Sequence, residues 1–391
     1  MGFELTNQQK DALQKTKQWW KNQNKQVWEI SGAAGTGKTT IVYYLINEIN
    51  LKKENVLFMA YIGKATLALA RKGNYAQTIH STIYDIIEVP KVTDDGELIT
   101  KNNRVVTRPE FCRKESLPKN IQLLVVDEAA MVSEQIALDI LSFGLPVIAL
   151  GDRNQLDPVF GTPFFLKHPD VVLTEPMRQS LDSPIIHLSQ LAMNGKYIQK
   201  GKYGNSCFVI DKSMITDKML TKSDVVICGR NKTRDMINRH VRHNILKIDK
   251  EYPIIGDKMI CRQNNWNRYI DDNIFLINGM VGFVENVYLE TYNGRSLAID
   301  FRPDFMDFEY FKKLVIDYKF LTDSYDSKMT NNKRSFYNKF EYAYAISVHL
   351  SQGSEWDTVL IYDEDYGTAE YRKKSLYTAI TRAKKNLILA I

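Results

Sequence analysis

The residues from Gly32 to Thr40 have the types and the spacing that bind nucleotide phosphates. The pattern G-x-x-x-x-G-K-T is complete, with Gly32, Gly37, Lys38 and Thr39 at its defined positions. Glycines let successive backbone N–H groups point at one anion, Lys38 would neutralise the β- and γ-phosphates, and the Thr39 hydroxyl is a ligand for Mg²⁺. A glycine-rich turn without a ligand is the weaker alternative. The predicted nucleotide-binding loop comprises Gly32, Ala33, Gly35, Thr36, Gly37, Lys38, Thr39 and Thr40.

Two carboxylates that follow an apolar run could complete a hydrolytic site. Residues 121–126 read IQLLVV, which is typical of a strand buried in a parallel sheet, and Asp127 and Glu128 come directly after them. Because α/β sheets place their chemistry at this end of a strand, we expect Asp127 to hold Mg²⁺ through water. Glu128 would orient or deprotonate the attacking water. Thr39 and Asp127 are thus the candidate metal ligands, and Lys38 and Glu128 are catalytic candidates.

Two glutamines are further candidates, and each has a structural alternative. Gln155 follows the apolar run 146–150 and could sense the γ-phosphate and pass its state to another lobe. A turn with an Asx cap is the other interpretation of this segment. The amide of Gln9 could read an adenine edge, since it donates and accepts together. Gln9 could equally complete a capping box with Thr6 at the start of a helix, and the residues alone leave this choice open.

The order of apolar runs predicts the fold class. Runs of the buried-strand kind alternate with helical patterns, which indicates an α/β protein with parallel sheets. Two stretches interrupt this order: a turn signal, DDG at 94–96, predicts a β-hairpin, and residues 256–340 predict a small β module. A basic helix is predicted over 231–247, with its charges facing solvent; a contact of these charges with nucleic acid is the weaker alternative. The predicted strands are 27–30, 56–61, 121–126, 146–150, 171–173, 224–228, 342–348, 358–362 and 386–391.

Composition sets wider limits on the function. With 391 residues the chain can form two or three domains, and its net charge of +6 permits a polyanionic partner without requiring one. The four cysteines are widely spaced and show no zinc-ligand pattern, as expected for reduced thiols in a cytosolic protein. The sequence has neither a signal-peptide core nor an apolar run of about 18 residues. We therefore expect a cytoplasmic protein without a membrane partner.

Taken in order, these segments resemble the motifs of superfamily 1 DNA helicases of the RecD-like branch. The resemblance runs from Leu5 to Ile391. LTNQQ is similar to the family's glutamine motif, GAAGTGKTT to its first motif, DEAAMV to the second and GDRNQLDPV to the third. PMRQ resembles the fourth motif, HLSQGSEWDTV the fifth and YTAITRAK the sixth, while GDKMI and NGMVG resemble the borders of a β-barrel insertion.

The resemblance implies an α/β fold with two RecA-like P-loop NTPase domains built on parallel sheets. A β-hairpin would be inserted in the first domain and a small SH3-like β-barrel in the second. The implied boundaries are 1–84 and 119–176 for the first RecA-like domain, 85–118 for the hairpin, 177–260 and 341–391 for the second RecA-like domain, and 261–340 for the β subdomain.

The resemblance also implies roles for individual residues. Gln9 would contact adenine and Glu355 would join the nucleotide site, while Arg178 and Arg382 would reach the γ-phosphate from the second lobe. Two departures concern the DNA strand: Tyr61-Ile62 stands where the family has Pro-Thr, and Leu350 where it has lysine. The expected DNA-binding residues are Ile62, Gly63, Lys64, Thr78, His80, Leu98, Asn231, His349, Ser351 and Gln352.

The expected function is that of an ATP- and Mg²⁺-dependent helicase that moves 5′→3′ on single-stranded DNA and unwinds a fork or a tailed duplex. The rival interpretations are a non-translocating, nucleic-acid-stimulated ATPase that acts as a switch or loader, and the same motor acting on RNA. We expect a monomer, in the bacterial host cytoplasm if the protein is phage-encoded. A single-strand-binding protein or a replisome component is a further candidate partner, in replication or recombination.

Overall fold

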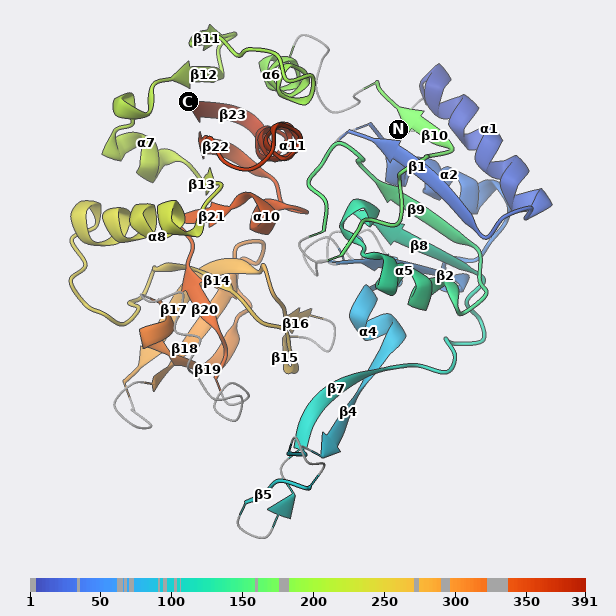
Figure 1. The fold of residues 1–391 in the computed structure, drawn as a ribbon, viewed down its shortest axis with the longest axis horizontal. Coiled ribbons are helices and arrows are strands. Elements are labelled where there is room, and N and C mark those ends of the chain that lie inside the picture. Colours follow the sequence, from blue (N-terminus) through green and yellow to red (C-terminus); the bar gives the residue numbers. More distant parts are fainter. Residues whose placement is uncertain are drawn as a thin grey trace.

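The structure is a computed structural model that describes residues 5–33, 36–61, 66, 69, 74–90, 92–93, 97–101, 104–105, 107–158, 161–175, 183–270, 274–289, 296–321 and 337–391. Two six-stranded sheets form two lobes, and an arm of antiparallel strands extends from the first lobe (Figure 1). A five-stranded antiparallel sheet lies below the second lobe in the same view. No helix among the described residues is long and apolar enough to span a membrane.

The sheet of lobe 1 is parallel throughout, as the apolar runs predict. Its order is β10 (Val171–Leu173), β1 (Val27–Gly32), β9 (Val147–Gly151), β8 (Leu123–Asp127), β2 (Val56–Ala60) and β3 (Ala76–Thr78). The first four residues of β8 are fully buried because they contribute to both faces of the sheet. Leu123 and Val125 pack with α1 (Asn7–Asn22) and α2 (Lys38–Glu48), whereas Leu124 and Val126 pack with α5 (Glu134–Leu141).

The sheet of lobe 2 repeats this plan with an antiparallel edge. Its order is β11 (Gly201–Tyr203), β12 (Cys207–Ile210), β23 (Ala383–Ala390), β22 (Trp356–Tyr362), β13 (Val225–Cys228) and β21 (Ala345–Ser347). Only β11 runs antiparallel to its neighbour in this sheet. The helices α6 (Pro184–Met193) and α11 (Ala369–Ile380) pack on one face, and α8 (Asn231–Arg239) packs on the other. The α/β fold is therefore confirmed, with one sheet that is parallel throughout and one that is parallel except for β11.

The arm comprises residues 84–113, and those of its residues that the structure describes form no apolar core of their own. Its strands β4 (Tyr84–Pro90) and β7 (Thr107–Arg113) pair antiparallel along their whole length, and β5 (Thr100–Lys101) pairs with β6 (Arg104–Val105) near the tip. The described apolar side chains of the arm are largely exposed, since Leu98 and Phe111 each leave more than half of their surface in solvent. The predicted turn residues 94–96 lie outside the described residues.

The five-stranded sheet has its own apolar core. Its order is β19 (Phe311–Asp317), β18 (Ser296–Pro303), β17 (Val281–Tyr288), β14 (Lys258–Cys261) and β20 (Phe340–Tyr342). Phe301 and Phe340 meet edge to face at 4.9 Å in that core. A separate pair, β15 (Asn265–Ile270) and β16 (Ile274–Leu276), extends towards the space between the lobes (Figure 1).

The prediction that the basic residues of 231–247 face solvent is wrong for two arginines. Arg234 is 2% exposed and lies 3.0 Å from Glu341, and Arg242 is 1% exposed and lies 3.2 Å from Asp257. The helix α8 continues as a π-helical stretch, His240–Ile245. Because the partner carboxylates come from the strands and turns of the five-stranded sheet, these buried ion pairs fasten that sheet to lobe 2.

Candidate functional site

The phosphate-binding loop connects β1 to α2, as the sequence predicts. Gly37 has φ 84° and ψ 21°, a left-handed conformation that glycine adopts without strain, and α2 begins at the next residue, Lys38. The Lys38 amine donates to the carbonyl oxygens of Gly32 at 2.6 Å and Ala33 at 3.0 Å. Thr39 and Thr40 lie in the first turn of α2 and are partly buried. The amine and the free N–H groups of this helix end are thus gathered at one point.

Only glycine fits at position 32. A Cβ atom there would lie 2.6 Å from the Thr36 hydroxyl oxygen and 2.9 Å from the Leu173 carbonyl oxygen. Thr36 is itself fully buried, and its hydroxyl donates to the Ala33 carbonyl at 2.9 Å. Thr36 therefore stabilises the conformation of the loop from its buried side. Gly35 lies outside the described residues, so its role stays a prediction.

Gln9 forms the capping box with Thr6 and also contacts the phosphate-binding loop. The capping box is present, because the Gln9 backbone N–H donates to Thr6 Oγ1 at 3.2 Å and Gln9 Oε1 accepts from the Thr6 N–H at 3.1 Å. The Gln9 side-chain amide also donates to the Thr36 carbonyl at 3.0 Å. One N–H and one lone pair of this buried amide are left over, so the adenine contact stays a prediction.

The acidic pair lies at the end of β8, beside the loop. Asp127 is the last residue of the strand, and its carboxylate accepts from the Glu128 N–H at 2.9 Å. Glu128 has φ 52° and ψ 39°, a left-handed conformation that costs a non-glycine residue roughly 1–3 kcal/mol. Such strain is common where a side chain must be aimed. Burial raises the pKa of Glu128, and Asp127 raises it further, while the charges of Arg382 and Lys38 act in the opposite direction.

Arg382 brings lobe 2 to the same place. It follows α11 and is 2% exposed, and its guanidinium donates to the carbonyls of Thr378 at 3.0 Å and Ser354 at 3.2 Å. Glu355, the next residue after this second acceptor, is partly buried in the same loop. Arg382 is close enough for its charge to lower the pKa of Glu128, so a cation of lobe 2 acts on the acidic pair of lobe 1. Arg178 lies outside the described residues.

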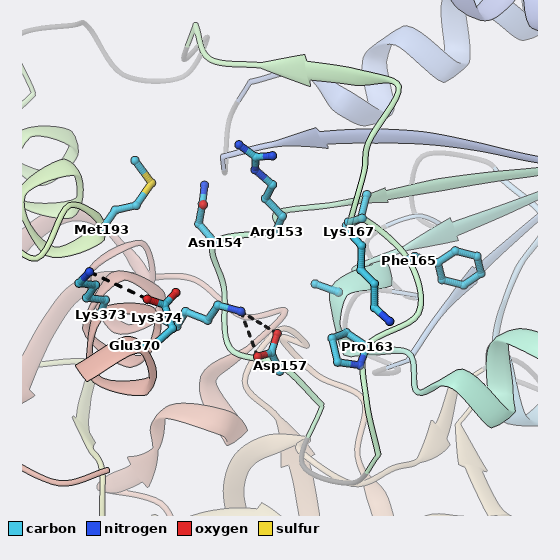
Figure 2. A pocket seen from close by; sticks show the side chains of 12 residues that line it. Arg153, Asn154, Asp157, Pro163, Phe165, Lys167, Met193, Glu370, Lys373 and Lys374 are labelled. Carbon is cyan, nitrogen blue, oxygen red and sulfur yellow. Dashed lines mark hydrogen bonds and ion pairs between the residues drawn. The ribbon is translucent and has the colours of Figure 1, made fainter. Parts of the chain in front are cut away.

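The segment after β9 joins the two lobes. The Asp152 carboxylate accepts from the Tyr377 hydroxyl at 2.5 Å, and the Leu156 N–H donates to the Thr378 hydroxyl oxygen at 3.0 Å. The Gln352 side-chain amide donates to the Leu156 carbonyl at 3.1 Å. Leu156 itself packs in the core of lobe 2, although its segment starts from the sheet of lobe 1. Figure 2 shows the next contact of this segment, in which Lys374 meets Asp157 at 2.8 Å.

The expected strand-contacting residues occupy different environments. Asn231 is exposed at the start of α8, and Leu98 is exposed on the arm. Ser351 and Gln352 are buried in this structure, where Ser351 donates to the Val348 carbonyl at 2.7 Å. Burial lowers the pKa of His349, which lies against the Tyr371 ring. The contacts of all these residues with DNA stay predictions, and Ile62, Gly63 and Lys64 lie outside the described residues.

An aromatic cluster surrounds His80 at the base of the arm. The His80 ring lies within 6 Å of the rings of Tyr61, Tyr84 and Phe111, and burial lowers its pKa. Thr78 caps the short helix α4 (Ile79–Ile83) that carries this histidine, accepting from the Ser81 N–H at 3.3 Å. The cluster thus places a partly buried imidazole beside the exposed ring of Phe111 at the base of the arm.

Comparison with known proteins assigns the chain to a family. The family described as AAA domain matches residues 4–207, more than half of the chain. The chain belongs to the AAA domain family. A second family, the UvrD-like helicase C-terminal domain, matches residues 342–390, which include the buried strands β22 and β23 of lobe 2.

Relatives of this AAA domain protein include helicases that match it along its whole length. The ATP-dependent DNA helicase dda of Enterobacteria phage T4 is 25% identical, over 97% of this chain and 98% of the relative. In a structure of two coordinating Pif1 helicases at forked double-stranded DNA, one chain is 18% identical with a TM-score of 0.58, covering 100% of this chain and 92% of that one. Bacteroides Pif1 in complex with ADP-AlF3 and single-stranded DNA has a TM-score of 0.54 and 18% identity, over 99% and 92%. The resemblance to RecD-like superfamily 1 helicases is confirmed.

The residues present in the AAA domain fit a nucleotide and Mg²⁺. The side-chain oxygen of Gln155 is buried and has no hydrogen-bond partner among the described residues. Thr39 and Asp127 supply the hydroxyl and carboxylate oxygens that Mg²⁺ prefers. No group of three or more His, Cys, Asp or Glu side chains in the described part of the chain could hold a metal alone. This is expected for Mg²⁺, which is usually held by few protein groups together with phosphates and water.

Sequence reasoning gave no role to Tyr377 or Thr378, two residues at the lobe contact. Both lie in the segment YTAITRAK, but their partners Asp152 and Leu156 are more than 220 positions away. The residues around Tyr377 and Thr378 in the sequence therefore give no indication of a contact with lobe 1. Tyr377 is 3% exposed, and burial together with the Asp152 carboxylate raises its pKa well above the ordinary value.

Proposed function

We propose that this protein is an ATP-dependent DNA helicase that moves 5′→3′ along single-stranded DNA and unwinds duplex. The observation that carries the proposal is the segment Asp152–Asp157, which links the nucleotide side of lobe 1 to Gln352 of the fifth motif on lobe 2. A motor needs such a link, because hydrolysis must change the contacts of the protein with its track. The full-length likeness to an ATP-dependent DNA helicase supports DNA as the track, and the 5′→3′ direction is what the resemblance to the RecD-like branch implies.

The side chains of lobe 1 have distinct tasks in this proposal. Lys38 and the N–H groups at the start of α2 bind the β- and γ-phosphates, and Thr39 and Asp127 hold Mg²⁺. Bound ATP supplies the phosphoanhydride bond whose hydrolysis powers the cycle. Glu128, aimed by its left-handed backbone, accepts a proton from the attacking water. Its raised pKa brings its basicity closer to that needed near neutral pH.

Lobe 2 completes the site only when the lobes approach. The Arg382 guanidinium would exchange one of its carbonyl partners, Thr378 or Ser354, for charge that develops on the transferred phosphoryl group. Arg178 would act beside it. Gln155 would contact the γ-phosphate, and its movement on hydrolysis would shift the neighbouring Leu156, whose carbonyl accepts from the Gln352 amide.

The remaining elements are proposed to act on DNA. Single-stranded DNA would cross both lobes, with bases stacking near His80 and Phe111. The arm would be the wedge that meets the fork, and the five-stranded sheet would be the SH3-like subdomain of lobe 2. The protein would act as a monomer in the cytoplasm, and a single-strand-binding protein or replisome component would be a partner.

The deciding experiment measures ATP hydrolysis with and without single-stranded DNA, beside unwinding of 5′-tailed and 3′-tailed duplexes. We expect DNA-stimulated hydrolysis and unwinding of the 5′-tailed duplex alone. Lys38→Ala is the control: it should abolish hydrolysis and unwinding but keep most DNA binding, because the phosphate loop and the strand-binding groove are separate. ATPase activity without directional unwinding would indicate a switch or loader, and matched RNA tails would identify an RNA motor.

A further inference from the structure

Both strands of the arm meet lobe 1 at the cross-strand pair Tyr84 and Arg113. Tyr84 is the first residue of β4 and pairs with Arg113, the last residue of β7. The Tyr84 hydroxyl donates to the Asp139 carboxylate of α5, and the Arg113 guanidinium lies over the Phe143 ring, 5.5 Å from its centre. Asp139 and Phe143 are four positions apart, so both strands contact lobe 1 around the end of α5. Figure 1 shows the arm leaving lobe 1 beside α4 and α5.

A second contact fixes the chain where it leaves the arm. The Lys114 backbone N–H donates to the Ile83 carbonyl at 2.8 Å, and the Lys114 amine donates to the Ser81 carbonyl at 2.9 Å. These carbonyls belong to the last turn of α4, where helix carbonyls lack partners within the helix and a cation is favourable. Because Ile79 and Ile83 of α4 are fully buried in the core that α5 shares, the entry and the exit of the arm are fixed to one packed unit.

The Tyr84 side chain is restricted and keeps its proton. Burial raises the pKa of Tyr84, and the hydrogen bond to Asp139 raises it further, so the hydroxyl stays a donor at neutral pH. The Tyr84 ring packs against the core between the sheet and α5, and it lies 5.8 Å from the rings of His80 and Phe111. A hydrogen bond to a carboxylate is stronger than one between neutral groups. The Tyr84–Asp139 bond is therefore suited to hold the root of the arm in one orientation.

The arm is long relative to its root. β4 and β7 pair over seven residues, which is a length of roughly 20 Å at the rise of an antiparallel strand. A rotation of about 10° at the root would move the far end by roughly 3–4 Å, close to the spacing of neighbouring bases along one DNA strand. A two-stranded ribbon has little stability of its own. The orientation of the arm therefore depends on its contacts at the root.

The helix that holds the root also follows the acidic pair. α5 begins at Glu134, six positions after Glu128. Ala129 and Ala130, which lie between them, are buried in the same core as Ile140 of α5. The arm and the acidic pair are thus attached to one strand-to-helix unit of lobe 1.

We propose that Tyr84 and Asp139 are positioning residues for strand separation. Their hydrogen bond holds the arm in one orientation to lobe 1, so that the arm advances with the lobe instead of rotating away when it meets the duplex. This role rests on the proposed function, in which the arm is the wedge, and it gives the root of the arm a task separate from that of the tip. Without this bond, hydrolysis and movement along single-stranded DNA continue, but fewer base pairs are opened for each ATP.

Comparing unwinding with movement along single-stranded DNA tests this role on the full chain. Tyr84→Phe keeps the ring and removes the hydroxyl, and Asp139→Ala removes the acceptor. Each is expected to lower unwinding of a 5′-tailed duplex about tenfold, and the double variant no further, because both remove the same bond. DNA-stimulated hydrolysis and translocation, followed by arrival at a dye on the 3′ end, should stay near the parent rates. Asp139→Asn retains an acceptor for the hydroxyl and should restore most of the unwinding.

Tyr203→Phe in lobe 2 is the matched control. It makes the same chemical change, since the Tyr203 hydroxyl donates to the Gln199 carbonyl at 2.8 Å, and it leaves the arm untouched. We expect this variant to unwind at the parent rate.

Distances between spin labels measure the orientation of the arm directly. Nitroxide labels are attached at Thr107→Cys, at the far end of β7, and at Lys52→Cys on lobe 1, in a chain that carries Cys112→Ser. Cys112 is the exposed cysteine, and the other three are buried. Tyr84→Phe should broaden the distribution of distances between the two labels, whereas Tyr203→Phe should not.

The proposed wedge and its anchor fail in different ways. If a protein with residues 92–99 replaced by a short turn unwinds at the parent rate, the arm is not the wedge, and both proposals are wrong. If that protein unwinds poorly but Tyr84→Phe unwinds as well as Tyr203→Phe, the anchor alone is overturned. An unchanged distance distribution in Tyr84→Phe also overturns the anchor, as does an equal loss of translocation and unwinding, which would indicate a general loss of structure.

Discussion

The two lobes share a sheet plan but differ in how far their reactive side chains are ready to act. In lobe 1, Lys38, Asp127 and Glu128 lie at strand ends or a helix start and are only partly buried. In lobe 2, Arg382 is buried and donates to carbonyls of its own lobe. Lys38 also donates to carbonyls of its own loop, so on the proposed roles both cations must exchange hydrogen-bond partners, and the difference is that Arg382 is 2% exposed whereas Lys38 is only partly buried.

Removing the cation of lobe 2 should have the largest effect. Arg382→Ala is expected to slow hydrolysis roughly 10³-fold or more with little loss of nucleotide affinity, because the arginine acts on charge that develops in the transition state. Arg178→Ala should have the same effect. Arg382→Lys tests whether a positive charge without the guanidinium geometry is enough to support hydrolysis. The measurement is turnover at saturating ATP and DNA, together with the Kd for a nucleotide analogue. An unchanged turnover would remove that arginine from the site.

The second-largest effect is expected from a change in lobe 1 that leaves ATP binding intact. Glu128→Gln is expected to retain ATP but to slow hydrolysis by about 10²- to 10³-fold, since an amide cannot accept the proton. Single-turnover hydrolysis and equilibrium ATP binding check this pair of outcomes. A variant that no longer binds ATP would show that the glutamate holds the fold of the loop instead.

The arm should matter for unwinding alone, which separates it from both lobes. Replacing residues 92–99 by a short glycine-containing turn is expected to leave DNA-stimulated hydrolysis nearly intact but to reduce unwinding at least tenfold. Each base-pair step costs about 1.4 kcal/mol to separate, so the fork needs a firm element to meet. Exposed Val92 and Leu98 face each other there in a β-bridge. If the shortened protein unwinds a tailed duplex at the parent rate, the arm has no role in separating the strands.

The smallest expected effect lies at the contact between the lobes. Tyr377→Phe removes the hydroxyl that donates to Asp152, and we expect stimulation by DNA to fall a few-fold while hydrolysis without DNA stays near the parent rate. The buried carboxylate then loses a partner, at a cost of about 1–3 kcal/mol in stability. Tyr371→Phe on the same helix, whose hydroxyl meets Tyr366 instead, is the matched control. Equal stimulation in both variants would contradict the proposed link.

Local sequence patterns predicted what depends on local chemistry. Most strand runs, the loop from Gly32 to Thr39 and the capping box of Gln9 follow from residues within a few positions of one another. The predicted strand 342–348 is wrong, because this segment forms the ends of two different sheets, β20 (Phe340–Tyr342) and β21 (Ala345–Ser347). Both interpretations of Gln9 rested on the same amide, and the structure shows the cap directly. The edge strand β11 and its neighbour β12 were not predicted; β11 reads GKY and has no aliphatic residue that would indicate a buried strand.

Contacts between distant segments could not be predicted in this way. Arg234 and Arg242 lie on what looks like the polar side of a helix, and only the carboxylates Glu341 and Asp257 make their burial possible. Tyr377 finds its partner in the other lobe.

Leu156 has a consequence for how the chain can be divided. It leaves the sheet of lobe 1 and fills a place in the core of lobe 2, where it is 2% exposed beside residues such as Leu188 and Tyr377. If lobe 2 were produced alone, from residue 183 onwards, its core would contain a hole of leucine size, and the typical penalty for such a hole is about 2–5 kcal/mol. Lobe 2 therefore depends on a side chain that follows the sheet of lobe 1 to reach full stability, and a recombination event that exchanged lobe 1 for that of a distant relative would have to preserve this single apolar side chain.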